Sequence, residues 1–223
     1  MKFSIATLSL LSLLFATAAS AAIKPYYQDI KLPTQKMVER QEILNPLAST
    51  LTTVLSAHAG ATSAAAVNVT SFAAQPDVPR NLNITPGGST SNVASCVITV
   101  TGTDILNDVI TDTFTFADNG AARVDGAKAF KTVTNINFPA SCEDNVFAAT
   151  WSVGLGEKLG VKRCMDKAGH ILFSTIDGAK EATAPTMAAN ASVVSSNTAD
   201  FSGAMDGSSD FELFFMQNFR CTN

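Results

Sequence analysis

The stretch Cys96-Val-Ile-Thr-Val-Thr101 decides the fold class, because apolar and polar side chains alternate along it. Successive side chains of a strand point to opposite faces, so Cys96, Ile98 and Val100 share one face. The threonines and Val97 share the other face. This pattern predicts a β-strand with one side in a core.

The same texture continues on both sides of this stretch, in short segments rich in Val, Thr, Ile and Phe. Asn-Gly and Asp-Gly pairs separate them and supply the positive φ that tight turns need. Many short strands with such turns indicate an antiparallel sandwich or barrel. We expect an all-β protein with an antiparallel β-sandwich of jelly-roll or Ig-like type. The expected strands are 68–72, 81–85, 96–101, 109–116, 130–137, 146–153, 170–176, 189–194 and 211–219.

The last expected strand is apolar on both faces. Phe214 and Met216 lie on one face, and the other face holds Phe211, Leu213, Phe215 and Phe219. Such a strand is central in the fold or is covered by a second element or a partner subunit. Core burial and self-association through the last strand are both open at this point.

Residues 22–66 differ from the rest of the chain. Apolar residues between Lys36 and Leu55 recur mostly at three- and four-residue steps, which predicts two short helices or one helix kinked at Pro46. The Ala/Ser-rich stretch 57–66 is typical of a linker. We therefore expect a short N-terminal helical arm and linker over 22–66 and the β-sandwich domain over 67–223.

The first residues have the pattern of a secretory signal peptide. Met1-Lys2 precedes an apolar run that ends in Ala19-Ser-Ala-Ala22, and we assign residues 1–21 to the signal. This signal peptide resembles those of secreted fungal proteins. No later segment has the roughly 20 apolar residues that a membrane helix requires, so we expect a secreted protein without a membrane span.

The cysteines agree with an oxidising compartment. Four cysteines in an exported chain predict two disulfides, which can pair in three ways. We favour Cys96–Cys142 and Cys164–Cys221, because each pairing ties the end of an expected strand to a neighbour. Three sequons, at Asn68, Asn83 and Asn190, are candidate N-glycosylation sites.

Several stretches of the β region occur in a characteristic order. They are Gln75-Pro-Asp-Val-Pro-Arg-Asn81, Val100-Thr-Gly-Thr-Asp-Ile105, Gly126-Ala-Lys-Ala-Phe-Lys-Thr-Val133, Val153-Gly-Leu-Gly-Glu-Lys-Leu-Gly160 and Glu181-Ala-Thr-Ala-Pro-Thr186. Over about residues 68–216 this set resembles a family of small tailed-phage virion structural proteins. The resemblance implies an all-β module that is capsid- or tail-associated and that acts by packing and association, without catalytic residues. The signal peptide, the cysteines and the N-terminal arm depart from that family, so a secreted form of the module fits the sequence better.

Composition limits the possible functions. The net charge is −4 and 15% of the residues are charged, so the chain lacks the basic surplus of a nucleic-acid binder. With two histidines and no close cysteine pair we expect no metal site and no cofactor.

The sequence carries no G-x-S-x-G, H-E-x-x-H or P-loop pattern. We expect neither His58 nor His170 to be a catalytic base, and we expect Trp151 in the core. Gly154–Gly160 and Asp206–Asp210 are expected turns. Carboxylates paired in space stay possible, and the candidate acids, expected in solvated loops, are Asp104, Asp108, Asp112, Glu143 and Asp144.

We therefore expect a secreted, non-enzymatic protein that acts by interaction at a cell surface, wall or host, for example as a fungal effector or elicitor. Its partner would be an unknown protein or a cell-surface or wall component. A virion structural or decoration protein is the first alternative. A secreted carbohydrate-active enzyme is the second, and it predicts a concave site with closely placed carboxylates.

Overall fold

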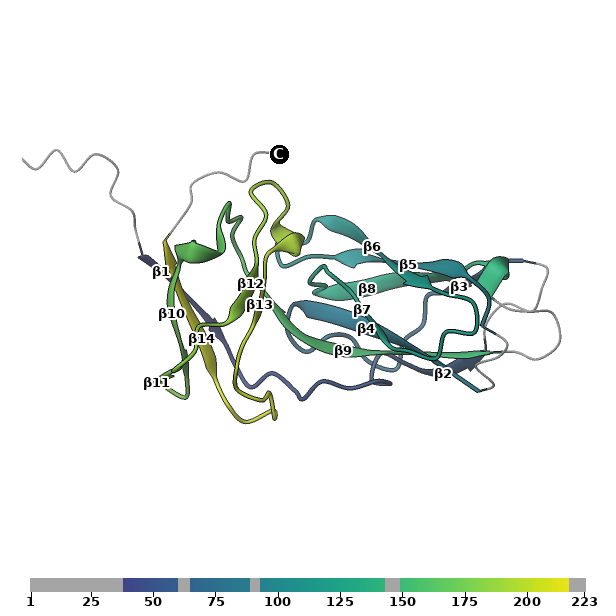
Figure 1. Cartoon of the computed structure of the whole chain (residues 1–223), viewed down its shortest axis with the longest axis horizontal. Coiled ribbons are helices and arrows are strands. Elements are labelled where there is room, and N and C mark those ends of the chain that lie inside the picture. Colours follow the sequence, from purple (N-terminus) through teal and green to yellow (C-terminus); the bar gives the residue numbers. More distant parts are fainter. Residues whose placement is uncertain (1–37, 60–64, 89–92, 143–148, 217–223) are drawn as a thin grey trace, which may run out of the picture. The chain divides into compact units, whose positions relative to one another are not determined.

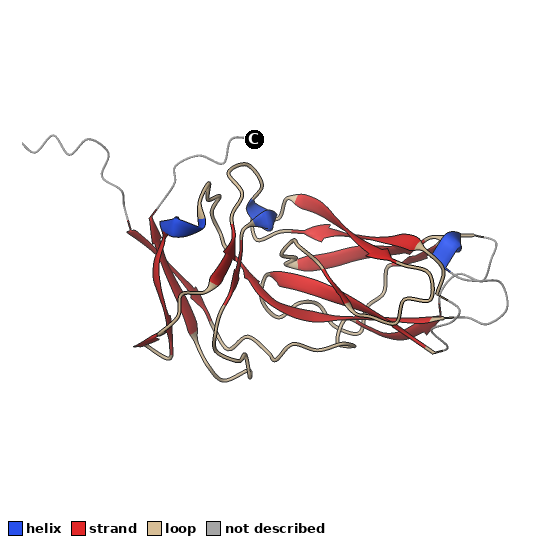
Figure 2. Ribbon diagram, viewed as in Figure 1, coloured by secondary structure: helices blue, strands red, loops and turns tan. Residues whose placement is uncertain are grey.

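The computed structural model describes residues 38–59, 65–88, 93–142 and 149–216. These residues form strands, 3-10 helices and loops, with no α-helix among them (Figure 2). The all-β, antiparallel class is confirmed. The strands are β1 Val38–Ile43, β2 Leu55–Ala59, β3 Val67–Val69, β4 Arg80–Gly87, β5 Cys96–Thr103, β6 Val109–Phe116, β7 Val124–Asp125, β8 Thr132–Phe138, β9 Thr150–Gly160, β10 Ile171–Ile176, β11 Ala179–Lys180, β12 Thr186–Ala188, β13 Thr198–Asp200 and β14 Phe211–Met216. The 3-10 helices are η2 Ala140–Cys142, η3 Ala168–His170 and η4 Val194–Ser196.

The strands form three sheets, which we number I to III (Figure 1). Sheet I has the order β1-β14-β10-β11. Sheet II has the order β12-β13-β9-β4-β7, and β2 also pairs with β9. Sheet III has the order β3-β8-β5-β6. The finer expectation of a jelly-roll or Ig-like sandwich stays a prediction.

Two hydrophobic cores hold these sheets, and β9 contributes to both. Trp151, Val153 and Leu155 belong to the larger core, together with apolar residues of sheet III. Leu159, at the other end of the same strand, belongs to a second core with β14. Trp151 is fully buried, as expected. Its ring packs edge-on against that of Phe116, with ring centroids 4.9 Å apart.

The expected helical arm is wrong over the described residues. Val38–Ile43 is a strand that pairs with β14, and residues 55–59 form a strand on β9. In β1 the buried positions alternate as a strand requires, but one of them is the polar Gln41, which bonds the carbonyl of Gly160 at 2.8 Å. Because a polar glutamine occupies a buried position, the alternation of apolar and polar residues that marks a strand is absent from the sequence. Leu44 and Leu47, which are about half exposed, have the three-residue spacing typical of a helix.

The boundary expected at residue 67 therefore does not separate an arm from a β domain. The compact unit that holds all described residues starts at Met37, and β1 and β2 are strands of its sheets. The signal peptide expected over 1–21 lies outside the described residues.

The expected turn at Gly154–Gly160 is wrong, because these residues lie inside the eleven-residue strand β9. The glycines serve close packing. A Cβ atom on Gly154 would lie 2.0 Å from the carbonyl oxygen of Thr50, and one on Gly156 would lie 2.1 Å from Oδ1 of Asn81. A glycine-rich strand thus lets neighbouring segments approach its backbone.

The expected strand 189–194 is also wrong. Strands lie on either side of it, at β12 and β13, and the intervening loop is held by the buried Asn197. The side-chain oxygen of Asn197 accepts the N–H groups of Met165 and Asn190, at 3.0 and 2.7 Å. This loop is therefore held by side-chain hydrogen bonds rather than by backbone pairing between strands.

The last expected strand is central in sheet I, between β1 and β10. Phe211, Leu213 and Phe215 are fully buried, whereas Phe214 and Met216 on the opposite face are only partly covered. The described part of this strand ends at residue 216.

Candidate functional site

The outer face of sheet III carries a regular array of threonine and asparagine side chains. Along β5 the apolar residues point into the core and the threonines point outward, and β6 shows the same alternation. We call this surface the Thr/Asn face. It consists of Asn68, Val97, Thr99, Thr101, Thr103, Val109, Thr111, Thr113, Thr115, Thr132, Asn135 and Asn137.

Strand register aligns these side chains in rows across the sheet. Asn68, Asn137, Thr99 and Thr113 form one row. The next rows are Asn135 with Thr101 and Thr111, and Thr132 with Thr103 and Val109. Neighbouring strands lie about 4.8 Å apart and every second residue repeats after about 6.8 Å, so the hydroxyl and amide groups form a two-dimensional lattice.

One side of the array is already hydrogen-bonded. Oδ1 of Asn68 accepts Nδ2–H from Asn137 at 2.9 Å and from Asn135 at 3.3 Å. The hydroxyls of Thr103 and Thr132 lie 2.6 Å apart. On β6 no described residue bonds the hydroxyls of the three exposed threonines, which are therefore available to a ligand.

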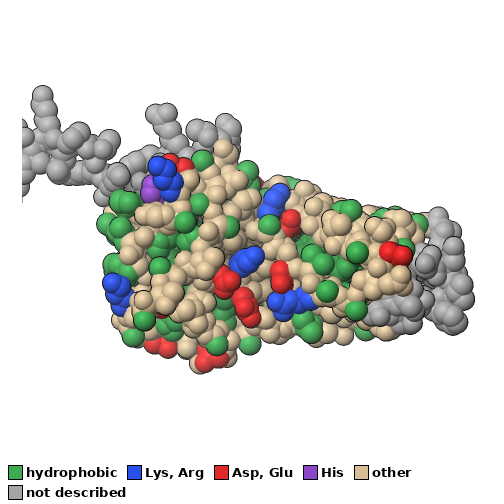
Figure 3. Space-filling view, viewed as in Figure 1, with side chains coloured by type: hydrophobic (Ala, Val, Ile, Leu, Met, Phe, Trp, Pro, Cys, Tyr) green, Lys and Arg blue, Asp and Glu red, His purple; other side chains and the backbone are tan. Residues whose placement is uncertain are grey.

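The Thr/Asn face contains no charged residue. Asp112, on the same strand β6, points inward and accepts the N–H groups of Ala127 and Lys128. Lys128 in turn donates from Nζ to the carbonyl of Thr111 at 2.6 Å. In Figure 3 charged side chains are sparse at the end of the view where strands of sheets II and III lie.

A second feature is a cavity of about 390 Å³ that two carboxylates line, Glu157 from β9 and Asp200 from β13. Residues 48–49 and 201–205 complete its wall. Burial, and then the negative charge of Glu157, raise the pKa of Asp200 above its usual range. The cavity is therefore lined by a carboxyl of raised pKa and by a second acid.

The acids that the sequence singled out do not form this pair. Oδ1 of Asp104 accepts the N–H groups of Leu106 and Asp108, and so fixes a turn. Asp112 holds the backbone beneath sheet III. Asp104 and Asp108 border a smaller hollow of about 220 Å³. Glu143 and Asp144 lie outside the described residues.

The two histidines lie in separate structural settings. His58 on β2 stacks on the ring of Phe138, with centroids 5.8 Å apart. Nδ1 of His170 lies 3.2 Å from the carboxylate of Asp166. The expectation that neither histidine is a catalytic base stays a prediction. The carboxylate of Asp206 accepts the N–H groups of Ser208 and Ser209, which fixes the expected turn.

The Cys96–Cys142 disulfide is confirmed, and it joins the start of β5 to η2. Cys164 is disulfide-bonded as well. Its expected partner, Cys221, lies outside the described residues, so that pairing stays a prediction. Among the described residues no cluster of three His, Cys, Asp or Glu side chains could hold a metal ion.

The sequons differ in accessibility. Asn68 is exposed on β3, and Asn190 is partly covered, with its side-chain oxygen bonded to the N–H groups of Ser192 and Val193. Asn83 is fully buried in β4, and its amide nitrogen donates to two carbonyls. A glycan does not fit on that nitrogen in the folded protein, so we withdraw Asn83 as a candidate.

Comparison of the chain with known protein families, with curated proteins and with solved structures finds no match. The resemblance to phage virion proteins therefore stays a prediction. No helix in the described ranges has the length and apolar character needed to cross a bilayer.

Sequence reasoning missed both features that the structure brings out. The alternating threonines at 99, 101, 103 and at 111, 113, 115 were visible as the polar side of two strands. Their alignment depends on register, which one sequence does not give. Glu157 and Asp200 are 43 positions apart and meet because β13 pairs with β9.

Proposed function

We propose that this protein acts outside the cell as a non-enzymatic binding protein, and that the Thr/Asn face is its contact surface. The single observation that carries the proposal is the uncharged, two-dimensional array of hydroxyl and amide groups on sheet III. The Cys96–Cys142 disulfide is compatible with an extracellular location.

The chemistry of the face selects the class of ligand. A nucleic acid needs cations to neutralise its phosphates, and this face has none. Protein interfaces concentrate their binding energy in Trp, Tyr and Arg, and the face carries none of these. Neutral hydroxyls and amides match a neutral polymer rich in hydroxyl groups. We therefore propose an uncharged cell-wall or cell-surface polysaccharide as the ligand.

β-Branched threonines suit this role. Their χ1 angle is restricted, so little side-chain entropy is lost when a hydroxyl is fixed by a ligand. Each hydrogen bond contributes only about 1 kcal/mol, so useful affinity requires many contacts at once. A repeating polymer surface offers such contacts along several rows of the lattice.

Co-sedimentation with insoluble chitin and β-glucan particles tests this proposal. The variant with Thr111→Glu and Thr113→Glu places two charges on the face, and we expect at least about a tenfold loss of bound protein. The matched control changes Thr52→Glu and Thr183→Glu, two exposed threonines elsewhere, and should bind like the wild type. Equal losses in both double variants, or no binding of the wild type to either particle, would overturn the proposal.

A second candidate, a secreted carbohydrate-active enzyme, is favoured by the cavity with Glu157 and Asp200. A carboxyl of raised pKa next to a second carboxylate suits a general acid and its partner in glycoside hydrolysis. Release of reducing sugar from soluble glucans would support this candidate. Loss of that release in Glu157→Gln and in Asp200→Asn, but not in Asp206→Asn at the exposed turn, would assign it to the cavity.

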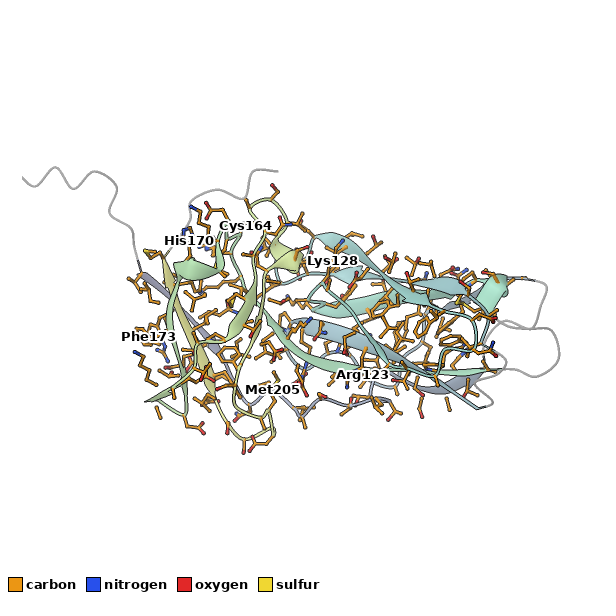
Figure 4. The ribbon with its side chains drawn as sticks, in the orientation of Figure 1. Arg123, Lys128, Cys164, His170, Phe173 and Met205 are labelled. Carbon is orange, nitrogen blue, oxygen red and sulfur yellow. A yellow bond between two sulfur atoms is a disulfide. The ribbon has the colours of Figure 1, made fainter. Side chains whose placement is uncertain are left out.

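The proposal includes self-association through the outer face of β14. There the rings of Phe214 and Phe173 stack with centroids 4.4 Å apart, and Nζ of Lys180 lies 5.8 Å from the centroid of the Phe173 ring. Figure 4 labels Phe173. Arg40 pairs with Glu212 on the same face. An apolar centre bordered by both signs of charge is self-complementary under a twofold axis, so we propose a second copy of this chain as its occupant.

Sedimentation velocity over a concentration series tests this association. Val38→Glu places a charge on the outer face of sheet I, at a residue that is 57% exposed. The control is Val97→Glu on sheet III, at a residue that is 47% exposed. Dimer in the wild type and the control, but monomer in Val38→Glu, supports the assignment. A monomeric wild type at all concentrations contradicts it.

A further inference from the structure

The sequons at Asn68 and Asn83 are in different structural environments, and that difference assigns them different fates. Asn83 is part of the larger core's framework. Its Nδ2 donates to the carbonyls of Thr50 and Leu155, at 2.8 and 2.9 Å, and its side chain is 0% exposed. Both N–H bonds of the amide are therefore used to join β4 to β9 and to the segment before β2.

A glycan on Asn83 is incompatible with this arrangement. It would replace one N–H with a bulky sugar and leave a buried carbonyl without its donor. The sugar would also have to displace the segment at Thr50, whose carbonyl oxygen accepts a hydrogen bond from this amide. A chain modified there could not pack that segment against β4.

Asn68 is in the opposite situation. It is exposed on β3, an edge strand of sheet III. Its Oδ1 accepts hydrogen bonds from Asn135 and Asn137, while no described residue accepts one from its Nδ2. Nδ2, the atom that would carry a glycan, is thus free of described partners, because the neighbouring side chains bond to Oδ1.

We propose that Asn68 is the N-glycan acceptor of the exported protein and that Asn83 stays unmodified. This inference rests on the export that the proposed function assumes. The donor is a lipid diphosphate-linked oligosaccharide. The new bond joins Nδ2 of Asn68 to the anomeric carbon of the first sugar, the lipid diphosphate leaves with the bonding electrons, and Nδ2 gives up one proton.

A glycan on Asn68 would cover part of the Thr/Asn face. Asn68 is opposite Asn137 and in the same row as Thr99 and Thr113. The glycan therefore borders the β3 side of the array and leaves the β6 side open. We assign the accessible binding area to the β6 side, where the hydroxyls of Thr111, Thr113 and Thr115 have no described partner.

The test is site-resolved mass analysis of the full chain secreted by a eukaryotic host. Enzymatic removal of an N-glycan converts its asparagine to aspartate, so each of the three sequons is scored separately, Asn190 included. Thr70→Ala removes the Asn68 sequon at an exposed position. Thr85→Val removes the Asn83 sequon. It breaks no described hydrogen bond, because the Thr85 hydroxyl is buried without a described partner.

We expect a glycan on the Asn68 peptide of the wild type, its loss in Thr70→Ala, and its full retention in Thr85→Val. A secreted, folded protein with Asn68 bare, or with a glycan on Asn83, would overturn the acceptor assignment and leave export intact. Retention of the whole chain inside the cell would overturn export, and with it the acceptor assignment. The two failures are therefore distinguishable.

Discussion

At the scale of single residues, Arg80 ties the two cores together. Its guanidinium is fully buried and donates to the carbonyls of Gly156 and Leu47, at 2.8 and 2.7 Å, and to the carboxylate of Asp77 at 3.2 Å. It also contacts the sulfur of Met205, which belongs to the second core. Burial, opposed by the charge of Asp77, lowers the pKa of Arg80. One side chain thus satisfies acceptors from four separate segments.

Arg80→Ala should lower the free energy of unfolding by about 3 kcal/mol or more, because it leaves buried carbonyls and Asp77 without their donor. Arg123→Ala is the matched control, since Arg123 and Asp125 form an ion pair that is about one-third exposed on both sides. We expect less than about 1 kcal/mol there. Urea titration measures both variants, and similar midpoints would contradict the role given to Arg80.

Asp200 gives a second prediction at this scale, through pH. The pKa of Asp200 is raised in the folded state. As the pH rises above the usual pKa range of an aspartate, the carboxyl must ionise beside Glu157, and this destabilises the folded protein. Asp200→Asn should therefore be more stable than the wild type near about pH 7 and lose that advantage near about pH 3, where Asp200 is protonated. Urea midpoints at the two pH values test this, and a constant difference would contradict it.

At the scale of elements, sequence alternation was a reliable guide wherever one face is apolar. β6 has the bounds that the sequence predicts, because Phe114 and Phe116 alternate with threonines. Alternation failed for β1, where the buried Gln41 replaces an apolar residue, and for β9, where glycines carry no side chain to show a period. In both strands the burial is decided by partners distant in sequence.

Gly154→Ala tests the packing of β9. The added Cβ would meet a backbone carbonyl, which cannot rotate away, so we expect a loss of about 3 kcal/mol or more. Gly169→Ala is the control, because a Cβ at that position meets nothing within 4 Å. Thermal unfolding of the two variants compares them directly, and an unchanged melting temperature for Gly154→Ala would show that the segment at Thr50 does not pack against β9.

At the scale of the whole molecule, β9 makes the two cores one cooperative unit. Its first half is buried in one core and its last residues in the other, so neither core can open without exposing part of this strand. We expect a single unfolding transition. Trp151 fluorescence reports the larger core and hydrogen exchange in β14 reports the second, and separate midpoints for the two probes would contradict the coupling.

The pairing of β1 with β14 has a mechanical consequence. These are the first and last strands of the described chain, and they run antiparallel with Val38 opposite Met216 and Ile43 opposite Phe211. A pull applied at Val38 and Met216 therefore loads one end of the ladder, and its bonds would break rung by rung rather than together in shear. Stretched through these two points, the β1–β14 ladder would therefore unzip at low force.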